Sequence, residues 1–293
     1  MKFGVFAALA SPYADRAVIE ALGRTAEERG VDAIWVPEHV VLFDEYASSY
    51  PYSPDGRIPA PPGSGMLEPF TLLSFLAACT TTPRLGTAIC LLPQRNPVYT
   101  AKEAAAVDYL SNGRFDFGIG VGWLEEEFRV VNVDWPKRGR RTDEYIEVMK
   151  ALWGDDPSEH HGDFYDLPAC SMFPKPVQTP HPPLHFGGES DAALRRVARV
   201  GQGWHTFNRL PDEVAAPLSR LVGLLEEHGR TRGDVEVTVS PYLHGLTPEM
   251  VEGYAEAGAD GVTAMVFATS ADEVRQAFDD LQPCIDVARS LNA

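Results

Sequence analysis

The segment Gly187-Gly188-Glu189-Ser190 combines residue types suited to holding a phosphate group. It follows a short apolar stretch, and Asp191 then opens a helical pattern. Glycines let a backbone approach a ligand closely, and the free N–H groups at the start of a helix bind anions. An ordinary turn in which Ser190 caps the helix explains the same residues equally well. The segment therefore predicts either a phosphate site or a plain helix start.

Glu38 and His39 follow the apolar run 33–36 directly. Histidine titrates near neutral pH, so His39 is a candidate general acid or base. The alternative is a structural histidine that is hydrogen-bonded at the rim of the fold. Neighbouring residues of a strand point to opposite faces, so Glu38 and His39 do not make a metal pair. The first strand is followed by no His-x-His, so no metal site is predicted, and a metal-dependent barrel hydrolase is a remote alternative.

The densest basic run of the chain comprises Lys137, Arg138, Arg140 and Arg141. It could receive the anionic tail of a ligand. A solvated helix face that pairs with Asp143 and Glu144 is the commoner outcome for such a run.

Short apolar runs alternate with amphipathic helical patterns along the whole chain. The expected strands span 3–8, 33–36, 85–91, 114–119, 184–186, 203–207, 235–239 and 261–267. The expected helices span 17–29, 69–81, 97–110, 142–153, 191–200, 212–228 and 247–258, and a last one opens at 270. Eight strand–helix units predict a (β/α)8 TIM barrel, formed as one domain over residues 1–293.

Two segments interrupt this alternation. The loop 37–67, after the second strand, is rich in proline, glycine and tyrosine, and a loop of this length in a compact domain is usually functional or disordered. Its aromatic content favours a lid or substrate-binding loop over a disordered one, with a packed surface excursion as the alternative. A small hairpin insertion is expected at 160–167, before the fifth strand; its His160 and His161 are predicted to be solvated.

The main rival fold is a doubly wound open sheet that binds a dinucleotide. Gly118, Gly120 and Gly122 give only G-x-G-x-G, because Trp123 occupies the last glycine position of the dinucleotide fingerprint. The acidic residues 125–127 that follow would repel a pyrophosphate. The barrel is therefore preferred.

In a barrel, function lies at the carboxyl ends of the strands. This rule selects Glu38 and His39, residues 93–96, Gly120 to Trp123, Gly187 to Ser190, residues 205–207, Ser240, Tyr242 and Phe267.

Bulk composition limits the classes of function. The formal net charge of −17 argues against nucleic acid, whose binders need basic surface. The four cysteines, Cys79, Cys90, Cys170 and Cys284, form no C-x-x-C and are expected to be reduced thiols of a cytoplasmic protein. The apolar N-terminus is too short for a signal peptide and fits a buried first strand. No apolar run approaches the roughly 20 residues of a membrane helix, so no membrane association is expected.

Several segments, in order, resemble the luciferase-like monooxygenase superfamily, and in particular its branch that uses the deazaflavin coenzyme F420. They are Ile34 to His39, Leu85 to Ile89, Asn96-Pro97, Tyr109 to Phe115, Gly118 to Trp123, Arg141 to Tyr145, Pro182 to Gly188 and Gly201 to Trp204. From Trp204 onward only the strand–helix rhythm matches.

The resemblance implies a cofactor ring at the barrel mouth. It implies a bulge after the third strand at Ala88-Ile89, often with a non-prolyl cis bond, that supports this ring. It places His39 near the reacting carbon as acid or orienting donor, with Glu38 beside it. The cofactor-binding set that it implies is Glu38, Ala88, Ile89, Gly120, Gly122, Trp123, Gly187, Gly188, Glu189 and Ser190, of which Gly187 and Gly188 hold the phosphate and Trp123 walls the site.

One departure bears on the substrate. The sugar-phosphate dehydrogenases of this family carry an acidic residue where this chain has Trp123. A less polar substrate, with a C=C or C=N bond to reduce, is therefore expected. The resemblance implies hydride transfer between coenzyme F420 and a small organic molecule, in a homodimer.

Two alternatives remain at this stage. One is an FMN-dependent monooxygenase that uses oxygen, since FMN and the deazaflavin share a ring shape and a phosphate. The other is a cofactor-binding protein without catalysis of its own.

Overall fold

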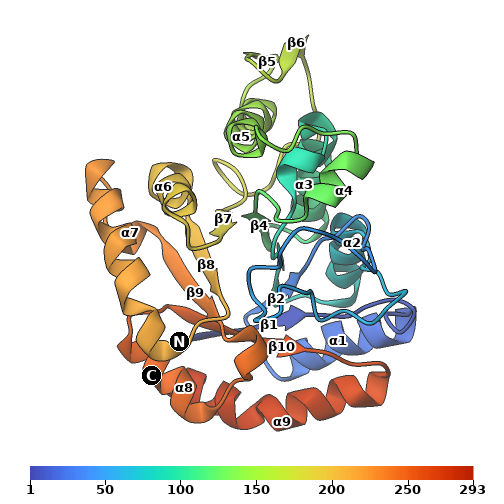
Figure 1. Cartoon of the computed structure of the whole chain (residues 1–293), viewed down its shortest axis with the longest axis vertical. Coiled ribbons are helices and arrows are strands. Elements are labelled where there is room, and N and C mark those ends of the chain that lie inside the picture. The colour runs from blue at the N-terminus through green and yellow to red at the C-terminus, as the bar shows by residue number, and fades with distance from the viewer. Residues whose placement is uncertain (293) are drawn as a thin grey trace.

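The computed structural model describes residues 1–292, and its centre is a closed barrel of eight strands (Figure 1). The order around the barrel is β1-β10-β9-β8-β7-β4-β3-β2, and neighbouring strands pair in parallel. The barrel strands are β1 (Lys2–Ala7), β2 (Ala33–Val36), β3 (Arg84–Thr87), β4 (Phe115–Ile119), β7 (Leu184–Gly187), β8 (Gly203–Phe207), β9 (Glu236–Ser240) and β10 (Gly261–Val266). They follow the eight predicted strands in order, which confirms the (β/α)8 prediction.

Helices surround the barrel. They are α1 (Arg16–Glu28), α2 (Pro69–Cys79), α3 (Pro97–Leu110), α4 (Glu125–Val130), α5 (Arg138–Gly154), α6 (Asp191–Val200), α7 (Ala215–Glu227), α8 (Pro248–Glu256) and α9 (Ala271–Ser290), with 3-10 turns at Leu92–Gln94, Pro211–Glu213, Arg232–Asp234 and Tyr242–His244. The hairpin of β5 (Ser158–His161) and β6 (Asp166–Cys170) lies at the end of the molecule beyond α5 (Figure 1).

Some boundaries differ from the sequence prediction for identifiable reasons. The third strand was expected to reach residue 91, but β3 ends at Thr87, where the chain enters a cis peptide bond between Ala88 and Ile89. The helix expected at 142–153 begins at Arg138, and the short α4 before it was not predicted. The helix expected from 212 begins only at Ala215, because a 3-10 turn occupies Pro211–Glu213.

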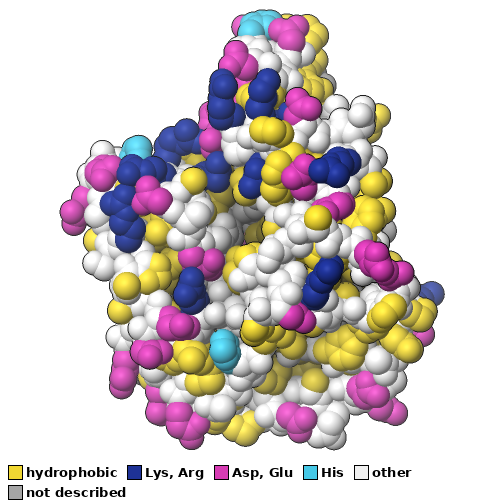
Figure 2. Space-filling model, in the orientation of Figure 1, with side chains coloured by type: hydrophobic (Ala, Val, Ile, Leu, Met, Phe, Trp, Pro, Cys, Tyr) yellow, Lys and Arg dark blue, Asp and Glu magenta, His cyan; other side chains and the backbone are white. Residues whose placement is uncertain are grey.

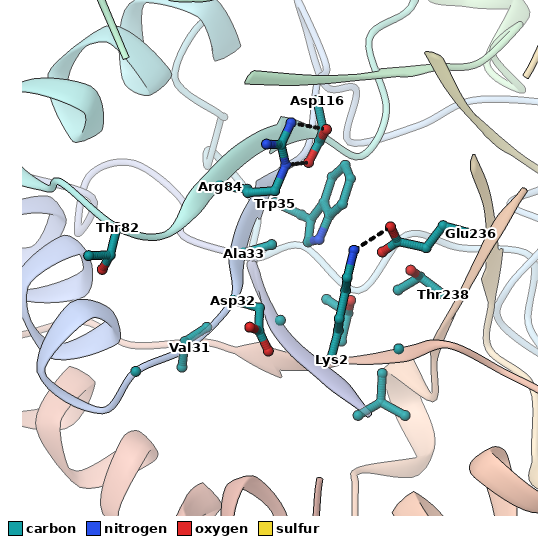
Figure 3. A pocket seen from close by; sticks show the side chains of 15 residues that line it. Lys2, Val31, Asp32, Ala33, Trp35, Thr82, Arg84, Asp116, Glu236 and Thr238 are labelled. Carbon is teal, nitrogen blue, oxygen red and sulfur yellow. Dashed lines mark hydrogen bonds and ion pairs between the residues drawn. The ribbon is translucent and has the colours of Figure 1, made fainter. Parts of the chain in front are cut away.

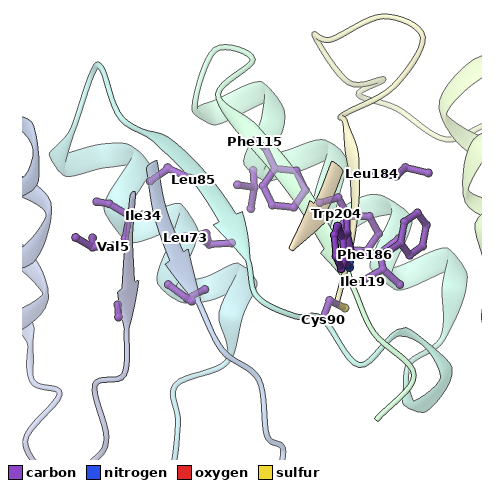
Figure 4. Close-up of a cluster of buried hydrophobic side chains, with 14 of the residues drawn as sticks. Val5, Ile34, Leu73, Leu85, Cys90, Phe115, Ile119, Leu184, Phe186 and Trp204 are labelled. Carbon is purple, nitrogen blue, oxygen red and sulfur yellow. The ribbon is translucent and has the colours of Figure 1, made fainter. Parts of the chain in front are cut away.

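The main hydrophobic core, of aliphatic and aromatic side chains, lies between the outer faces of the strands and the helices (Figure 4). Alternate strand residues such as Val5, Ile34 and Leu85 point into this layer and are completely buried. The alternation follows from the period of two in a strand, which sends successive side chains to opposite faces. Helix residues such as Leu73 close the layer from outside.

The inside of the barrel is unusually polar. TIM barrels are mostly filled with branched aliphatic side chains, whereas here Trp35, His185 and His205 occupy alternate inward positions, with the Trp35 ring 5.2 Å from His185 and 5.1 Å from His205. Glycines make room for these rings. A Cβ on Gly86 would lie 2.3 Å from the Trp35 ring, and one on Gly203 would lie 1.9 Å from Nδ1 of His185.

A pocket of about 310 Å³ lies at the amino ends of the strands (Figure 3). Its charges pair with one another: Lys2 Nζ lies 2.6 Å from Glu236, and Arg84 makes a two-pronged ion pair with Asp116 at 2.5 and 2.6 Å. Because barrel chemistry takes place at the opposite end, these pairs are assigned to closure of the barrel base.

Over residues 1–292, no helix is both long and apolar enough to cross a bilayer.

Candidate functional site

A cavity of about 550 Å³ opens at the carboxyl ends of the barrel strands. The face of the molecule that contains α6 and the loop 37–67 is hollowed at its centre, and Lys and Arg side chains gather over α5 and α6 beside the hollow (Figure 2). The lining includes Glu38, His39, Ala88, Ile89, Gly120, Gly122, Trp123, Gly187 and Gly188. The structure thus brings together most of the predicted site residues.

The cavity has two chemically different sides. Small residues from the ends of β3, β4 and β7 form one side, which we call the glycine side: Ala88, Ile89, Gly120, Gly122, Gly187 and Gly188. Rings from β1, β8, the segment after β9 and the loop 37–67 form the other, which we call the aromatic side: Phe6, Tyr50, Tyr52, Phe207 and Tyr242. The small side leaves room for a flat ring close to the backbone.

Ile89 lies at the middle of the glycine side. The peptide bond before it is cis, as the resemblance implied. A Cβ on Gly120 would lie 2.0 Å from Cδ1 of Ile89, and one on Gly187 would lie 3.1 Å from Cγ2. A side chain at position 120 would therefore displace Ile89, and one at position 187 would press on it.

Glu38 supports the bulge from behind. Its carboxylate accepts hydrogen bonds from the backbone N–H of Leu91 at 2.5 Å and from Nε of Arg95 at 2.7 Å. Arg95 also reaches Glu68 and Glu103. The Glu38 carboxylate is thus used within the protein, and a direct contact with a cofactor stays a prediction.

His39 is held by a second glutamate. Its Nδ1 lies 3.2 Å from Oε2 of Glu127, which is fully buried and also receives Nε2 of Gln94 at 3.0 Å. The other oxygen of Glu127 accepts the backbone N–H of Val40 at 2.7 Å. A carboxylate at Nδ1 makes that nitrogen the donor, which leaves Nε2 as the site that exchanges a proton. His39 borders the cavity, so the arrangement suits a general acid or base.

Trp123 forms the wall between the two sides of the cavity. Its ring lies 5.7 Å from His39 and 5.0 Å from Tyr50 in edge-to-face geometry. Tyr46 packs on it from the same loop at 5.5 Å. Trp123 lines the cavity, its role beside a cofactor stays a prediction, and Tyr50 and Tyr52 of the loop 37–67 line the cavity as well.

Glu126 fastens the loop to α4. Its carboxylate accepts the backbone N–H of Ala47 at 2.7 Å and the Ser48 hydroxyl at 2.7 Å. The acidic segment 125–127, considered at first only for its repulsion of a pyrophosphate, therefore anchors the loop and orients His39.

Acid is expected to release the loop. Desolvation raises the pKa of Glu126, but the hydrogen bonds from Ser48 and Ala47 outweigh it and lower the pKa to about 2. A carboxylate with a lowered pKa stabilises the folded loop at pH values above its unfolded pKa of about 4.3 and loses this effect as the pH falls toward 2. The protection of residues 46–50 against hydrogen exchange, measured relative to the unfolded chain at the same pH, should therefore fall between about pH 4.5 and pH 2. Glu126→Gln should show the low protection already at pH 6, and equal protection in both proteins would contradict the anchor.

A recess of about 250 Å³ adjoins the glycine side at Gly120 and Gly187. Ser190 and the first turn of α6 form one wall, and Arg138 and Arg196 approach from α5 and α6. Ser190 caps α6 by accepting the N–H of Ala193 at 3.2 Å. Gly188 has a φ of +99°, which favours glycine. For residues 187–190, the sequence left open a phosphate site or a plain helix start. The two are compatible, since the same turn caps α6 and borders a recess.

Arg138 differs from the other arginines of the basic run. Arg140 pairs with Asp163 at 2.7 Å, and Arg141 donates to the carbonyl of Asp134 at 2.8 Å. Arg138 lies 3.6 Å from the Trp135 ring centroid, and among residues 1–292 it has no carboxylate within ion-pair distance. Burial lowers its pKa, and Glu125 only partly offsets this. The Arg138 guanidinium is thus a partly buried positive charge that no carboxylate neutralises.

The expected pairing of the basic run with Asp143 and Glu144 is wrong. Asp143 binds Arg196 and Arg199 of α6, each at 2.7 Å. Glu144 accepts backbone N–H groups of residues 163–165 in the β5–β6 turn. These carboxylates point to other elements, so Arg138 stays available to the recess.

Two further predictions need correction or restriction. Glu189 was assigned to the cofactor, but its carboxylate accepts the Thr206 hydroxyl and the Phe207 N–H, both at 2.9 Å, so a cofactor contact through it stays a prediction. His160 was expected to be solvated. Its Nε2 is buried 3.8 Å from Glu144, whereas His161 is exposed and bonds to Asp166 at 2.5 Å. In the described chain, no three His, Cys, Asp or Glu side chains are grouped as for a metal ion.

Three site residues escaped the sequence analysis: Glu127, Arg196 and Phe6. Glu127 lies on the unpredicted α4, and the patterns of the helix and strand that carry Arg196 and Phe6 gave no reason to single them out. For Arg196, the position six residues after Ser190 on the helix of the presumed phosphate site was an available signal.

The family follows from a comparison with known proteins. Residues 1–281 match the family model described as luciferase-like monooxygenase. The chain belongs to this family. An uncharacterized protein of Mycobacterium tuberculosis is 36% identical over 241 residues, which cover 82% of each chain.

Proteins that resemble this chain are named for different cofactors. The FMNH2-dependent dimethylsulfone monooxygenase of Pseudomonas putida is 34% identical over 196 residues, which are 61% of this chain and 54% of that protein. An F420-dependent secondary alcohol dehydrogenase, solved with an F420–acetone adduct, superposes with a TM-score of 0.75 over 98% of both chains at 17% identity, a likeness that concerns the fold. The family membership indicates oxidoreductase or monooxygenase chemistry with a flavin-type cofactor.

Proposed function

We propose that this protein transfers a hydride between coenzyme F420 and a small organic substrate. The observation that carries the proposal is Arg138, a half-buried cation without a carboxylate partner that borders the recess beside Gly187 and Ser190. F420 continues beyond its phosphate into a tail with several carboxylates, whereas FMN ends at the phosphate. Arg138, on α5 beside the recess, suits the longer anion.

The residues fit such a cofactor. The glycine side admits a flat ring against Ile89, and the recess offers the amides of the α6 start to a phosphate, which leaves Arg138 for the carboxylates of the tail. When bound, F420 supplies or accepts the hydride. Trp123 and the loop 37–67 exclude water from the cavity, and His39, oriented by Glu127, exchanges a proton at Nε2.

The second candidate is an FMN-dependent monooxygenase. The identity of 34% to the dimethylsulfone monooxygenase favours it. The same glycine side and the same recess accept FMN. The two candidates therefore differ in whether the protein binds the carboxylate tail of F420 and whether its reduced cofactor reacts with oxygen.

Arg138→Ala is expected to weaken F420 binding by roughly 10- to 100-fold, since a hydrogen bond to a charged group contributes about 1.5–3 kcal/mol. FMN binding should change less if only F420 extends past the recess. The measurement is a fluorescence titration of wild type and variant with oxidised F420 and, separately, with FMN. Arg140→Ala is the matched control, because Arg140 is exposed and bound to Asp163.

Tight F420 binding and weak FMN binding by the wild type support the proposal. The reverse preference, together with oxygen consumption by the reduced flavin complex, replaces it with the monooxygenase. Binding of neither molecule contradicts both.

A further inference from the structure

The aromatic side of the cavity is a preformed box of rings. Phe207 lies 4.4 Å from Tyr242, 5.0 Å from Tyr52 and 5.4 Å from Phe6. Tyr50 closes the box against Trp123 at 5.0 Å. Four different parts of the chain supply these rings, and several of them meet edge to face, the geometry in which aromatic groups pack favourably.

The box offers no free charge to a ligand. Glu38 and His39 are the ionisable groups of opposite sign along the cavity, and both are held: Glu38 by Arg95, and His39 by Glu127. The nearby Glu189 is occupied by Thr206 and Phe207. An anion would leave water without a counter-charge, which is costly in an apolar site, and a cation would have only the faces of the rings in place of one. The protein's net charge of −17 further disfavours an anion.

His205 borders the same cavity from inside the barrel. It is 4% exposed, and both of its ring nitrogens lack a hydrogen-bond partner among the described residues. Buried polar groups of folded proteins nearly always have a partner, and an unsatisfied one costs about 1–3 kcal/mol. A half-turn about χ2 exchanges each ring nitrogen with a ring carbon, so either edge of the imidazole can face the cavity.

We propose that the aromatic side binds an uncharged, ring-containing substrate that carries one hydrogen-bonding group, such as a carbonyl, and that His205 contacts this group. The inference rests on the proposed function, which assigns the glycine side to the cofactor and so leaves the aromatic side to the substrate. It adds the class of substrate and a polar contact that is separate from His39.

The chemistry of His205 suits contact with a neutral group. Burial, together with a smaller effect of the neighbouring His185, lowers the pKa of His205 to about 3. The imidazole therefore stays neutral at physiological pH and has one donor and one acceptor nitrogen. A neutral donor can hold a carbonyl oxygen without burying a charge, in contrast to the proton exchange assigned to His39.

Four probes of similar size test the proposal: acetophenone, α-methylstyrene, benzoate and phenyltrimethylammonium. α-Methylstyrene replaces the carbonyl oxygen of acetophenone by CH2, and the other two carry opposite charges. Dissociation constants are measured by calorimetry on the protein alone and on the protein saturated with F420. We expect acetophenone to bind roughly 100-fold tighter than benzoate and roughly 10-fold tighter than the ammonium ion. Equal or tighter binding of either ion overturns the proposal.

The contact of His205 with the carbonyl group is tested by the ratio of the affinities for acetophenone and α-methylstyrene. His205→Phe should lower the preference for acetophenone over α-methylstyrene by roughly 10-fold, because the buried carbonyl loses its partner. His185→Phe is the control. It makes the same change beside the same Trp35 ring but does not border the cavity, so the ratio should stay constant. An unchanged ratio in His205→Phe overturns the contact.

A measurement on the unaltered protein covers the case in which a variant fails to fold. The imidazole ¹⁵N signals of His205 should shift on addition of acetophenone and stay constant on addition of α-methylstyrene. The measurements with F420 distinguish failure of the proposed function from failure of the proposed aromatic substrate site. If F420 fails to bind while acetophenone binds to the protein alone, the proposed function fails and the aromatic subsite stands. If F420 binds and the neutral probes bind no better than the ions, only the present inference fails.

Discussion

His39→Ala is expected to lower turnover by roughly 10²- to 10⁴-fold, the usual contribution of a positioned general acid or base. The imidazole borders the cavity, and Nδ1 is engaged by the buried Glu127, which fixes the ring and leaves Nε2 to exchange the proton. A water molecule in its place would be a much weaker proton donor than an imidazolium.

The measurement is reoxidation of reduced F420 on the enzyme by a saturating carbonyl acceptor. F420 affinity should stay within about threefold of wild type, since His39 is not assigned to cofactor binding. Added imidazole should restore part of the activity of His39→Ala, a result that a purely structural histidine would not give. Turnover by His39→Ala equal to that of the wild type would show that the role given to His39 is wrong.

Glu127→Gln provides the matched control. The amide retains an acceptor oxygen for Nδ1 of His39 but loses the negative charge that favours the imidazolium form. Activity should fall less than in His39→Ala, because the ring keeps its partner at Nδ1 while the charge beside it is lost. Activity equal to that of the wild type would mean that the charge of Glu127 plays no part in turnover.

Gly118→Ala is expected to lower the free energy of unfolding by about 3 kcal/mol, near the upper end of the usual range for overpacking. A Cβ at this position would lie 1.8 Å from the carbonyl oxygen of Thr87 and 2.9 Å from its carbonyl carbon. The obstacle is backbone, so no side chain can rotate out of the way. The carbonyl of Gly118 also accepts the Thr87 hydroxyl at 2.6 Å and the Cys90 N–H at 2.8 Å, so the chain on both sides is fixed.

Thermal and urea unfolding measure this effect, with an expected fall in Tm of roughly 6–12 °C for a protein of this size. Gly223→Ala is the control: it lies within α7, and an added Cβ there meets nothing within 4 Å. Helix propensity predicts that this control is neutral or stabilising by up to about 1 kcal/mol. A Gly118→Ala variant as stable as wild type would contradict the close approach of β3 and β4 described above.

The sequence predicted the architecture well because its signals are local. Alternating apolar runs and helical patterns depend on residues a few positions apart, and all eight barrel strands appear in the predicted order. Residues at the strand ends, among them His39, Gly120, Trp123, Gly187 and Gly188, were selected by a rule of the fold, and the structure places all of them around one cavity. The bulge at Ala88-Ile89 came from the family resemblance.

The tertiary structure alone decided which groups act together. Glu127 meets His39 across 88 positions of sequence, and Arg95 meets Glu38 across 57. No local periodicity reports such contacts, because they depend on where separate loops and helices end in space. For the same reason, the free Arg138, the paired Asp143 and the polar barrel interior around His205 could not be told from their neighbours in the sequence. The chain's local pattern determined the barrel, and long-range packing determined which of its polar side chains are neutralised inside the protein and which remain free for a ligand.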